Sequence, residues 1–333
     1  MTATATLTRQ PSATRTATRT ATQTLTRTAT RTPRPSATPT PTTDPADLGI
    51  IAFGVAEGVP PAQKLASALL EFPYIAFSGT TDTRIELINM SDRTQTVQCF
   101  YVRQSDCNEI GFFVSLTAGQ PLSWLVSTGT RNVLTFTAVP PFDGVGELKC
   151  AVAPRTPEIA SHNVLQGRAI VYDRITGETV GYGASGFQRL VPGDFPGVVD
   201  LDGFTYEACP ERLHFQVLTA TSVSGDLVLV PCAQDLLTQT PTQTVVQLAI
   251  VNEFEQVFSS SFRFRCHTRL SLGGIGALRK AVLGTDTAHL VVRGVDSPLL
   301  GLVVDRFDAL GARQTAVNEA FLEGGSPATV IFP

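Results

Sequence analysis

Apolar and polar residues alternate with a period of two along most of the chain, in short runs separated by turn residues. Gly, Pro, Asp and Asn recur between the runs at intervals of about 8–12 residues. The clearest runs are 83–90, 95–102, 110–116, 146–152, 226–232, 244–252 and 260–266. This pattern predicts β-strands. A helical pattern is confined to Pro61 to Leu70 and Ile275 to Leu283, so we expect an all-β fold.

The alternation also assigns a face to many side chains. It places three cysteines on the buried face of their strands: Cys99, Cys150 and Cys266. It places four charged side chains on the opposite, solvent-facing side: Glu147, Lys149, Arg263 and Arg265.

The two halves of the chain show a weak internal similarity. Residues 83–102 resemble 244–266, and 164–184 resemble 298–320. This suggests two copies of one module, roughly 71–190 and 205–333, joined by 191–203. We therefore expect two tandem Ig-like/Greek-key β-sandwich modules after a disordered Thr/Pro-rich tract. The predicted domains are 1–47 for the tract, 48–195 for the first module and 196–333 for the second.

The N-terminal tract differs sharply in charge from the rest. Residues 1–43 hold six arginines and no acidic residue, so their net charge is +6. Because the net charge of the whole chain is −4, the remaining residues carry −10. A Thr- and Pro-rich tract of this kind cannot bury enough surface to fold and is typical of stalks outside the cytoplasm. A basic arm could suit nucleic acid, but the body has only three lysines and no basic run. We expect no nucleic-acid partner.

No stretch approaches the roughly 18 apolar residues of a membrane helix, so no membrane span is predicted. The first residues show no secretory signal peptide. We expect the protein to be extracellular or in the cell envelope, with its export signal outside this sequence.

The six cysteines are compatible with disulfides. No CxxC or paired His accompanies them, which argues against zinc and thioredoxin-like chemistry. Their even number favours disulfides in an oxidising compartment. The best-supported pair is Cys232–Cys266, which would join two strands of the second module. For the others two possibilities remain open: Cys99–Cys107, which leaves Cys150–Cys209, or Cys99–Cys150 across the core with Trp124 between them.

Motifs for catalysis or cofactor binding are missing from the sequence. Gly181 to Gly186 matches GxGxxG, but Pro192 and Pro196 follow it where a dinucleotide site needs a helix. A glycine-bearing strand end is expected there instead. No GxSxG, HExxH or P-loop occurs, and four histidines show no triad or metal spacing: His162, His214, His267 and His289. We expect no catalytic residue and no cofactor.

Four acidic residues cluster near the expected joint between the modules: Asp194, Asp200, Asp202 and Glu207. Carboxylate oxygens are calcium ligands, so these are weak candidates for a calcium site. Asp-Gly at 202–203 is also ordinary turn chemistry. Asn89-Met90-Ser91 is a formal N-glycosylation sequon.

Several segments resemble an uncharacterised family of secreted bacterial β-rich proteins: 99–124, 146–150, 162–167, 208–210, 227–237 and 251–259. The resemblance implies an extracellular or envelope location and assigns no activity. The leading hypothesis is a non-enzymatic extracellular or cell-surface structural or binding protein, with an unknown extracellular protein or glycan as partner. The alternative is a secreted hydrolase of glycan or peptide with a site on loops. An intracellular protein would require six free thiols.

Overall fold

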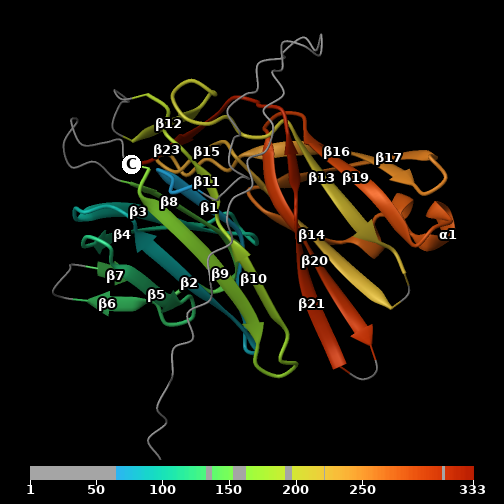
Figure 1. The fold of residues 1–333 in the computed structure, drawn as a ribbon, viewed down its shortest axis with the longest axis horizontal. Helices are drawn as coiled ribbons and strands as arrows, with labels where there is room; N and C mark the ends of the chain where they lie inside the picture. The colour runs from blue at the N-terminus through green and yellow to red at the C-terminus, as the bar shows by residue number, and fades with distance from the viewer. Residues whose placement is uncertain (1–64, 133–136, 153–162, 192–196, 221, 310–311) are drawn as a thin grey trace, which may run out of the picture. The chain divides into compact units, whose positions relative to one another are not determined.

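Strands dominate the computed structural model, which describes residues 65–132, 137–152, 163–191, 197–220, 222–309 and 312–333 (Figure 1). Within these residues the structure is 63% strand and 4% helix, so the prediction of an all-β fold is confirmed. The predicted disordered tract, 1–47, lies outside the described residues.

The first half of the described chain forms two antiparallel sheets and a short ribbon. The five-stranded sheet has the order β11 (Ser185–Phe187), β1 (Leu69–Phe77), β8 (Gly144–Val152), β3 (Gln95–Arg103) and β4 (Glu109–Leu116). The four-stranded sheet has the order β10 (Thr179–Gly183), β9 (Leu165–Asp173), β2 (Thr81–Asn89) and β5 (Pro121–Leu125). The ribbon contains β6 (Thr130–Asn132) and β7 (Thr137–Val139). Phe72, Tyr101 and Trp124 belong to the apolar core shared by the two sheets.

The second half forms two further antiparallel sheets. One has the order β17 (Val257–Arg265), β16 (Gln243–Asn252), β19 (Thr287–Gly294), β13 (Arg212–Leu218) and β22 (Phe321–Glu323). The other has the order β18 (Thr268–Ser271), β14 (Val223–Pro231), β20 (Leu299–Ala309) and β21 (Ala312–Glu319). Three short helices follow β18: η2 (Leu272–Gly274), η3 (Gly276–Leu278) and α1 (Lys280–Leu283). Phe215, Leu248 and Leu290 belong to the core between these sheets.

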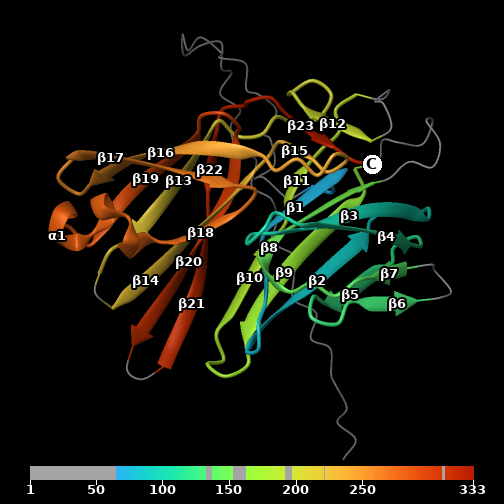
Figure 2. The same cartoon turned by 180° about the vertical axis from the view of Figure 1, so that it is seen from behind.

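A small three-stranded sheet connects distant parts of the chain. It contains β12 (Val198–Leu201), β23 (Ala328–Ile331) and β15 (Gln234–Asp235), which Figure 2 shows together near the C-terminus. The pair β15–β23 is parallel. The core beneath it combines residues of both halves, including Leu69, Val102, Leu201 and Val330. The two halves therefore share buried apolar surface.

The prediction of two tandem Ig-like/Greek-key sandwiches is wrong. The five sheets of three or more strands form a five-bladed β-propeller arrangement, and the tandem repeat is not supported. The blades are not consecutive segments, since strands β1 to β5 and β8 to β11 are divided between two sheets that the chain visits more than once. Apolar alternation shows which face of a strand is buried, but it does not show which sheet the strand joins. The predicted boundary at 195–196 falls within 192–196, outside the described residues.

The helix predictions had different outcomes. Of Pro61 to Leu70, the described part contains no helix, and Leu69 and Leu70 begin β1. This strand is buried on both faces, and a continuous apolar run cannot be distinguished from a buried helix by periodicity. The helical pattern of Ile275 to Leu283 is confirmed in part, as η3 and α1.

Candidate functional site

A shallow depression lies where the turn between β3 and β4 meets the end of β17, and we name it the junction depression. Its volume is about 420 Å³. Nine residues line it: Gln104, Ser105, Asp106, Cys107, Gln243, Arg263, Phe264, Arg265 and His267. Most of these side chains are polar, so the depression suits a polar ligand.

Local hydrogen bonds shape the β3–β4 turn. Arg103 N donates to Asn108 O at 3.0 Å, and Cys107 N donates to Arg103 O at 2.8 Å. The Asp106 carboxylate accepts from Asn108 N at 3.1 Å and from Arg103 Nε at 3.0 Å. These donors, the Asn108 amide first, hold the pKa of Asp106 below its usual value. Asp106 is therefore ionised, and Arg103 compensates its charge.

A disulfide between Cys107 and Cys266 joins the two walls of the depression, although the residues are 159 positions apart. Their φ angles are 58° and 46°, in the left-handed region that residues other than glycine seldom adopt. Such a conformation persists only where the surrounding structure enforces it. The relative position of the walls is thus covalently fixed.

Two arginines supply the free charge of the depression. Arg263 and Arg265 point outward from β17 and are exposed. Among the described residues, no ion pair or hydrogen bond engages either guanidinium group. The predicted outward orientation of both side chains is confirmed. A guanidinium group offers five N–H donors, so this wall can bind an anion.

His267 adds a neutral acceptor beneath this surface. It is only 3% exposed, and its Nε2 lies 3.0 Å from Pro73 O. Because a carbonyl only accepts, Nε2 carries the proton and Nδ1 has a lone pair. Nδ1 has no hydrogen-bond partner in the described part of the chain. Burial lowers the pKa of His267 to about 4, so the ring is neutral near pH 7.

A separate group of charges, the buried ionic cluster, contains Glu71, Glu147 and Lys149, all with 0% exposure. Lys149 Nζ lies 2.8 Å from Glu71 Oε2 and 3.4 Å from Glu147 Oε2. It also donates to Pro231 O at 3.1 Å. The predicted solvent exposure of Glu147 and Lys149 is wrong, because residues of the second half, including Pro231 and its neighbours, pack on this face of β8. None of these three side chains is accessible to solvent.

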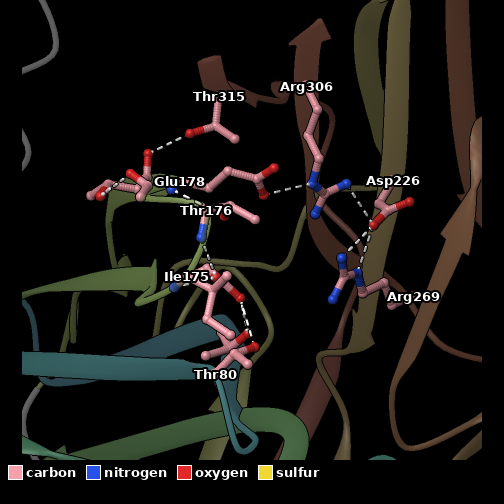
Figure 3. A network of polar contacts seen from close by, with 12 residues as sticks. Thr80, Ile175, Thr176, Glu178, Asp226, Arg269, Arg306 and Thr315 are labelled. Carbon is pink, nitrogen blue, oxygen red and sulfur yellow. Dashed lines mark hydrogen bonds and ion pairs between the residues drawn. The ribbon is translucent and has the colours of Figure 1, made fainter. Parts of the chain in front are cut away.

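A third polar group surrounds Arg306 of β20 and includes Asp226 of β14, Arg269 of β18 and Glu178, which directly precedes β10 (Figure 3). Arg306 Nη1 lies 2.9 Å from Asp226 Oδ2, and its Nε lies 3.4 Å from Glu178 Oε2. Arg269 Nη2 contacts the same Asp226 oxygen at 2.6 Å. Burial alone would raise the pKa of Asp226, but Arg269 and Arg306 hold it below its usual value. These charges neutralise one another and stabilise the contact between the halves.

The described histidines outside the depression form a pair on an open sheet face. His214 Nδ1 lies 3.0 Å from His289 Nε2, and His214 Nε2 lies 2.5 Å from Glu323 Oε2. None of the hydrogen bonds of these histidines or of His267 reaches a serine or cysteine. His162 lies outside the described residues. The arrangement is a hydrogen-bonded chain that ties β22 to β13.

The structure pairs all six cysteines: Cys99–Cys150, Cys107–Cys266 and Cys209–Cys232. The pairings Cys232–Cys266, Cys99–Cys107 and Cys150–Cys209 are therefore wrong, because the true partners come together only through tertiary contacts. The rival pairing Cys99–Cys150 is correct, but it joins directly opposed residues of neighbouring strands and not two sheets. Trp124 lies in the same core, on β5.

The calcium candidates do not meet. Asp200 accepts from Thr329 Oγ1 at 2.9 Å, and Glu207 accepts from Gln188 N at 2.8 Å. Asp202 instead caps its own turn through two backbone amides. In the part of the chain that the structure describes, no group of three acidic, Cys or His side chains could hold a metal ion. Asp194 lies outside that part.

Two sequence motifs find structural explanations. Gly181 to Gly186 lies in β10 and β11, the strand context predicted for it. Asn89 of the sequon is fully buried, and its Nδ2 donates to the backbone oxygens of Arg93, Leu116 and Thr117. This amide is occupied and inaccessible, so it stabilises the β2–β3 turn.

The sequence reasoning missed the junction depression itself. It placed Arg263 and Arg265 outward and Cys266 inward, but nothing in the sequence shows that Cys107 meets this strand.

Among the described residues no helix is long and apolar enough to cross a bilayer. The three disulfides indicate an extracellular or otherwise oxidising environment. No family model and no curated protein matches the sequence.

Proposed function

We propose that this protein is a non-enzymatic extracellular or cell-surface binding protein, and that the junction depression binds an anionic group of its ligand. The observation that carries the proposal is the pair of exposed guanidinium groups, Arg263 and Arg265, which have no anionic partner among the described residues. They lie beside a disulfide that fixes the site. A preformed site of this kind binds without the cost of ordering mobile segments.

The chemistry of the lining supports a carboxylate ligand. Two guanidinium groups can each form paired N–H···O bonds with a carboxylate. Among the described residues of the lining, Asp106 alone is acidic, and Arg103 already compensates its charge. Ser105 and the amide of Gln243 can bind neighbouring polar groups of the same ligand. We therefore narrow the expected partner from an unknown extracellular protein or glycan to one that presents carboxylate groups.

The alternative of a secreted hydrolase has less support. Glu147, whose pKa burial raises to about 8, would suit a general acid, but it is fully buried against Lys149. Glu71, whose pKa burial also raises, is equally inaccessible. Carboxylates with raised pKa values serve catalysis only where substrate can reach them.

The test is a titration of the full-length protein with glutarate, a dicarboxylate able to span two guanidinium groups. The arginine Nε–H signals of Arg263 and Arg265 in NMR spectra are expected to shift saturably. The double variant R263A/R265A is expected to bind at least about tenfold more weakly, because charge-assisted hydrogen bonds contribute roughly 1.5–3 kcal/mol each.

The matched control is Arg131→Ala, which removes one exposed arginine from β6 in the first half of the chain. Every variant keeps the six arginines of residues 1–43, so their nonspecific attraction for anions cancels in the comparison. Equal weakening by Arg131→Ala, or unchanged affinity of the double variant, would contradict the proposal.

A further inference from the structure

Strand β17 is one edge of its five-stranded sheet. Its pairing with β16 determines which backbone groups face the open edge. Cys266 N donates to Thr242 O, and Asn252 N donates to Gln256 O. In an antiparallel ladder, residues facing the partner alternate with residues facing away. The backbone N–H and C=O groups of the even-numbered residues of β17 therefore point toward β16. Those of the odd-numbered residues point toward the open edge.

The outward backbone groups belong to Val257, Ser259, Ser261, Arg263 and Arg265. Among the described residues, only one hydrogen bond uses any of them, from His267 N to Arg265 O. Natural proteins usually protect a long edge with proline, a bulge or inward charges. From Val257 to Ser261 β17 has neither a proline nor a charge, and its register with β16 runs without a shift. A regular row of donors and acceptors is thus open for pairing.

This open edge runs directly into the junction depression, because Arg263, Phe264 and Arg265 belong to both. A single extended ligand can therefore use the edge and the depression together. The repeat of unpaired amides and carbonyls matches the backbone of a β-strand, which saccharides do not reproduce.

From this geometry we infer that β17 binds an extended acidic peptide segment of another protein by β-strand addition, with its carboxylates seated at Arg263 and Arg265. The inference rests on the proposed function and deepens it. Backbone pairing supplies the row of hydrogen bonds, and the two arginines select segments with acidic residues at one end.

A second copy of this chain is a poorer occupant on the grounds of charge. β17 itself contains no acidic residue, so pairing two copies would leave all four guanidinium groups without a counter-charge inside the strand pair. Buried or crowded like charges reduce affinity, whereas an acidic strand neutralises them.

The probe is an N-acetylated, fluorescein-labelled hexapeptide of alternating valine and threonine that ends in two glutamates. Binding to the full-length protein is measured by fluorescence anisotropy. Replacing both glutamates with glutamines is expected to weaken binding at least about tenfold, as is the protein variant R263A/R265A.

Two further peptides test strand pairing without altering the protein. Each is N-methylated at alternate amides, one at the odd positions and one at the even positions. A strand that pairs along one edge uses only one of these sets, so one peptide should lose binding at least tenfold while the other binds normally. Equal affinities of the two peptides would overturn the inference.

On the protein side, Ser261→Pro removes an outward N–H and should abolish peptide binding, whereas Ser261→Ala keeps it. Ser259→Pro is the second variant if Ser261→Pro does not fold. Glutarate binding distinguishes a failure of the anion site from a failure of strand addition. Loss of peptide binding with glutarate binding retained supports strand addition.

Two other outcomes would overturn it. If both proline variants still bind the peptide and glutarate, the anion site is supported and β-strand addition at β17 is contradicted. Dimers of the free protein by light scattering that Ser261→Pro converts to monomers would make a second copy the occupant.

Discussion

Replacing Lys149 with methionine is expected to lower the free energy of unfolding by about 3–5 kcal/mol, because it leaves two buried carboxyl groups without their cation. Glu71 and Glu147 have 0% exposure, and Lys149 Nζ contacts both. For a chain of this size the loss corresponds to a fall in Tm of roughly 10 °C. Urea denaturation followed by circular dichroism measures it.

The triple variant E71M/E147M/K149M distinguishes charge burial from packing. Buried ion groups replaced by apolar side chains of similar size often cost little stability. The triple variant should therefore recover most of the stability that Lys149→Met loses. If it is as unstable as the single variant, the packing of the lysine chain matters more than its charge.

The same cluster makes stability depend on pH. Burial raises the pKa of Glu147 to about 8 in the folded protein, above its usual 4.5. The folded state thus holds this proton more tightly than the unfolded state, so the stabilisation is complete below pH 4.5 and is lost as the pH rises through about 8. Glu147→Gln should flatten this loss between pH 5 and pH 8. An unchanged slope would show that another group causes it.

The second large effect is expected from the disulfide Cys107–Cys266. Its cysteines are 159 residues apart, whereas Cys209 and Cys232 are separated by only 23. Chain entropy in the unfolded state predicts a loss of about 5 kcal/mol for the long loop and about 3 kcal/mol for the short one. C107A/C266A should therefore be less stable than C209A/C232A in urea.

Backbone strain does not confound this comparison. Alanine in the left-handed region at 107 and 266 is strained much as cysteine is, so the substitution adds little new strain. C107A/C266A should also weaken glutarate binding, because the walls of the junction depression lose their link. A smaller stability loss than that of C209A/C232A would contradict the entropic account.

The local features of the candidate site could be predicted from the sequence, but the way they come together in the fold could not. The period of two in 260–266 placed Arg263 and Arg265 outward, because side chains alternate along a strand whatever its neighbours. The partner of Cys266 could not be read in the same way. Six cysteines allow 15 pairings, and only the tertiary fold brings Cys107 to β17.

By itself, the sequence determined that this is an all-β protein, because strand periodicity is a local property of the chain, and its even number of cysteines indicated disulfides. Only the tertiary structure decided the five-bladed arrangement, the burial of Glu147 and Lys149, and the junction depression. These depend on contacts such as β12 with β23 and Lys149 with Pro231, between residues distant in the chain. A pattern of two-residue period shows that a strand has a buried face, but it does not say what covers the other face.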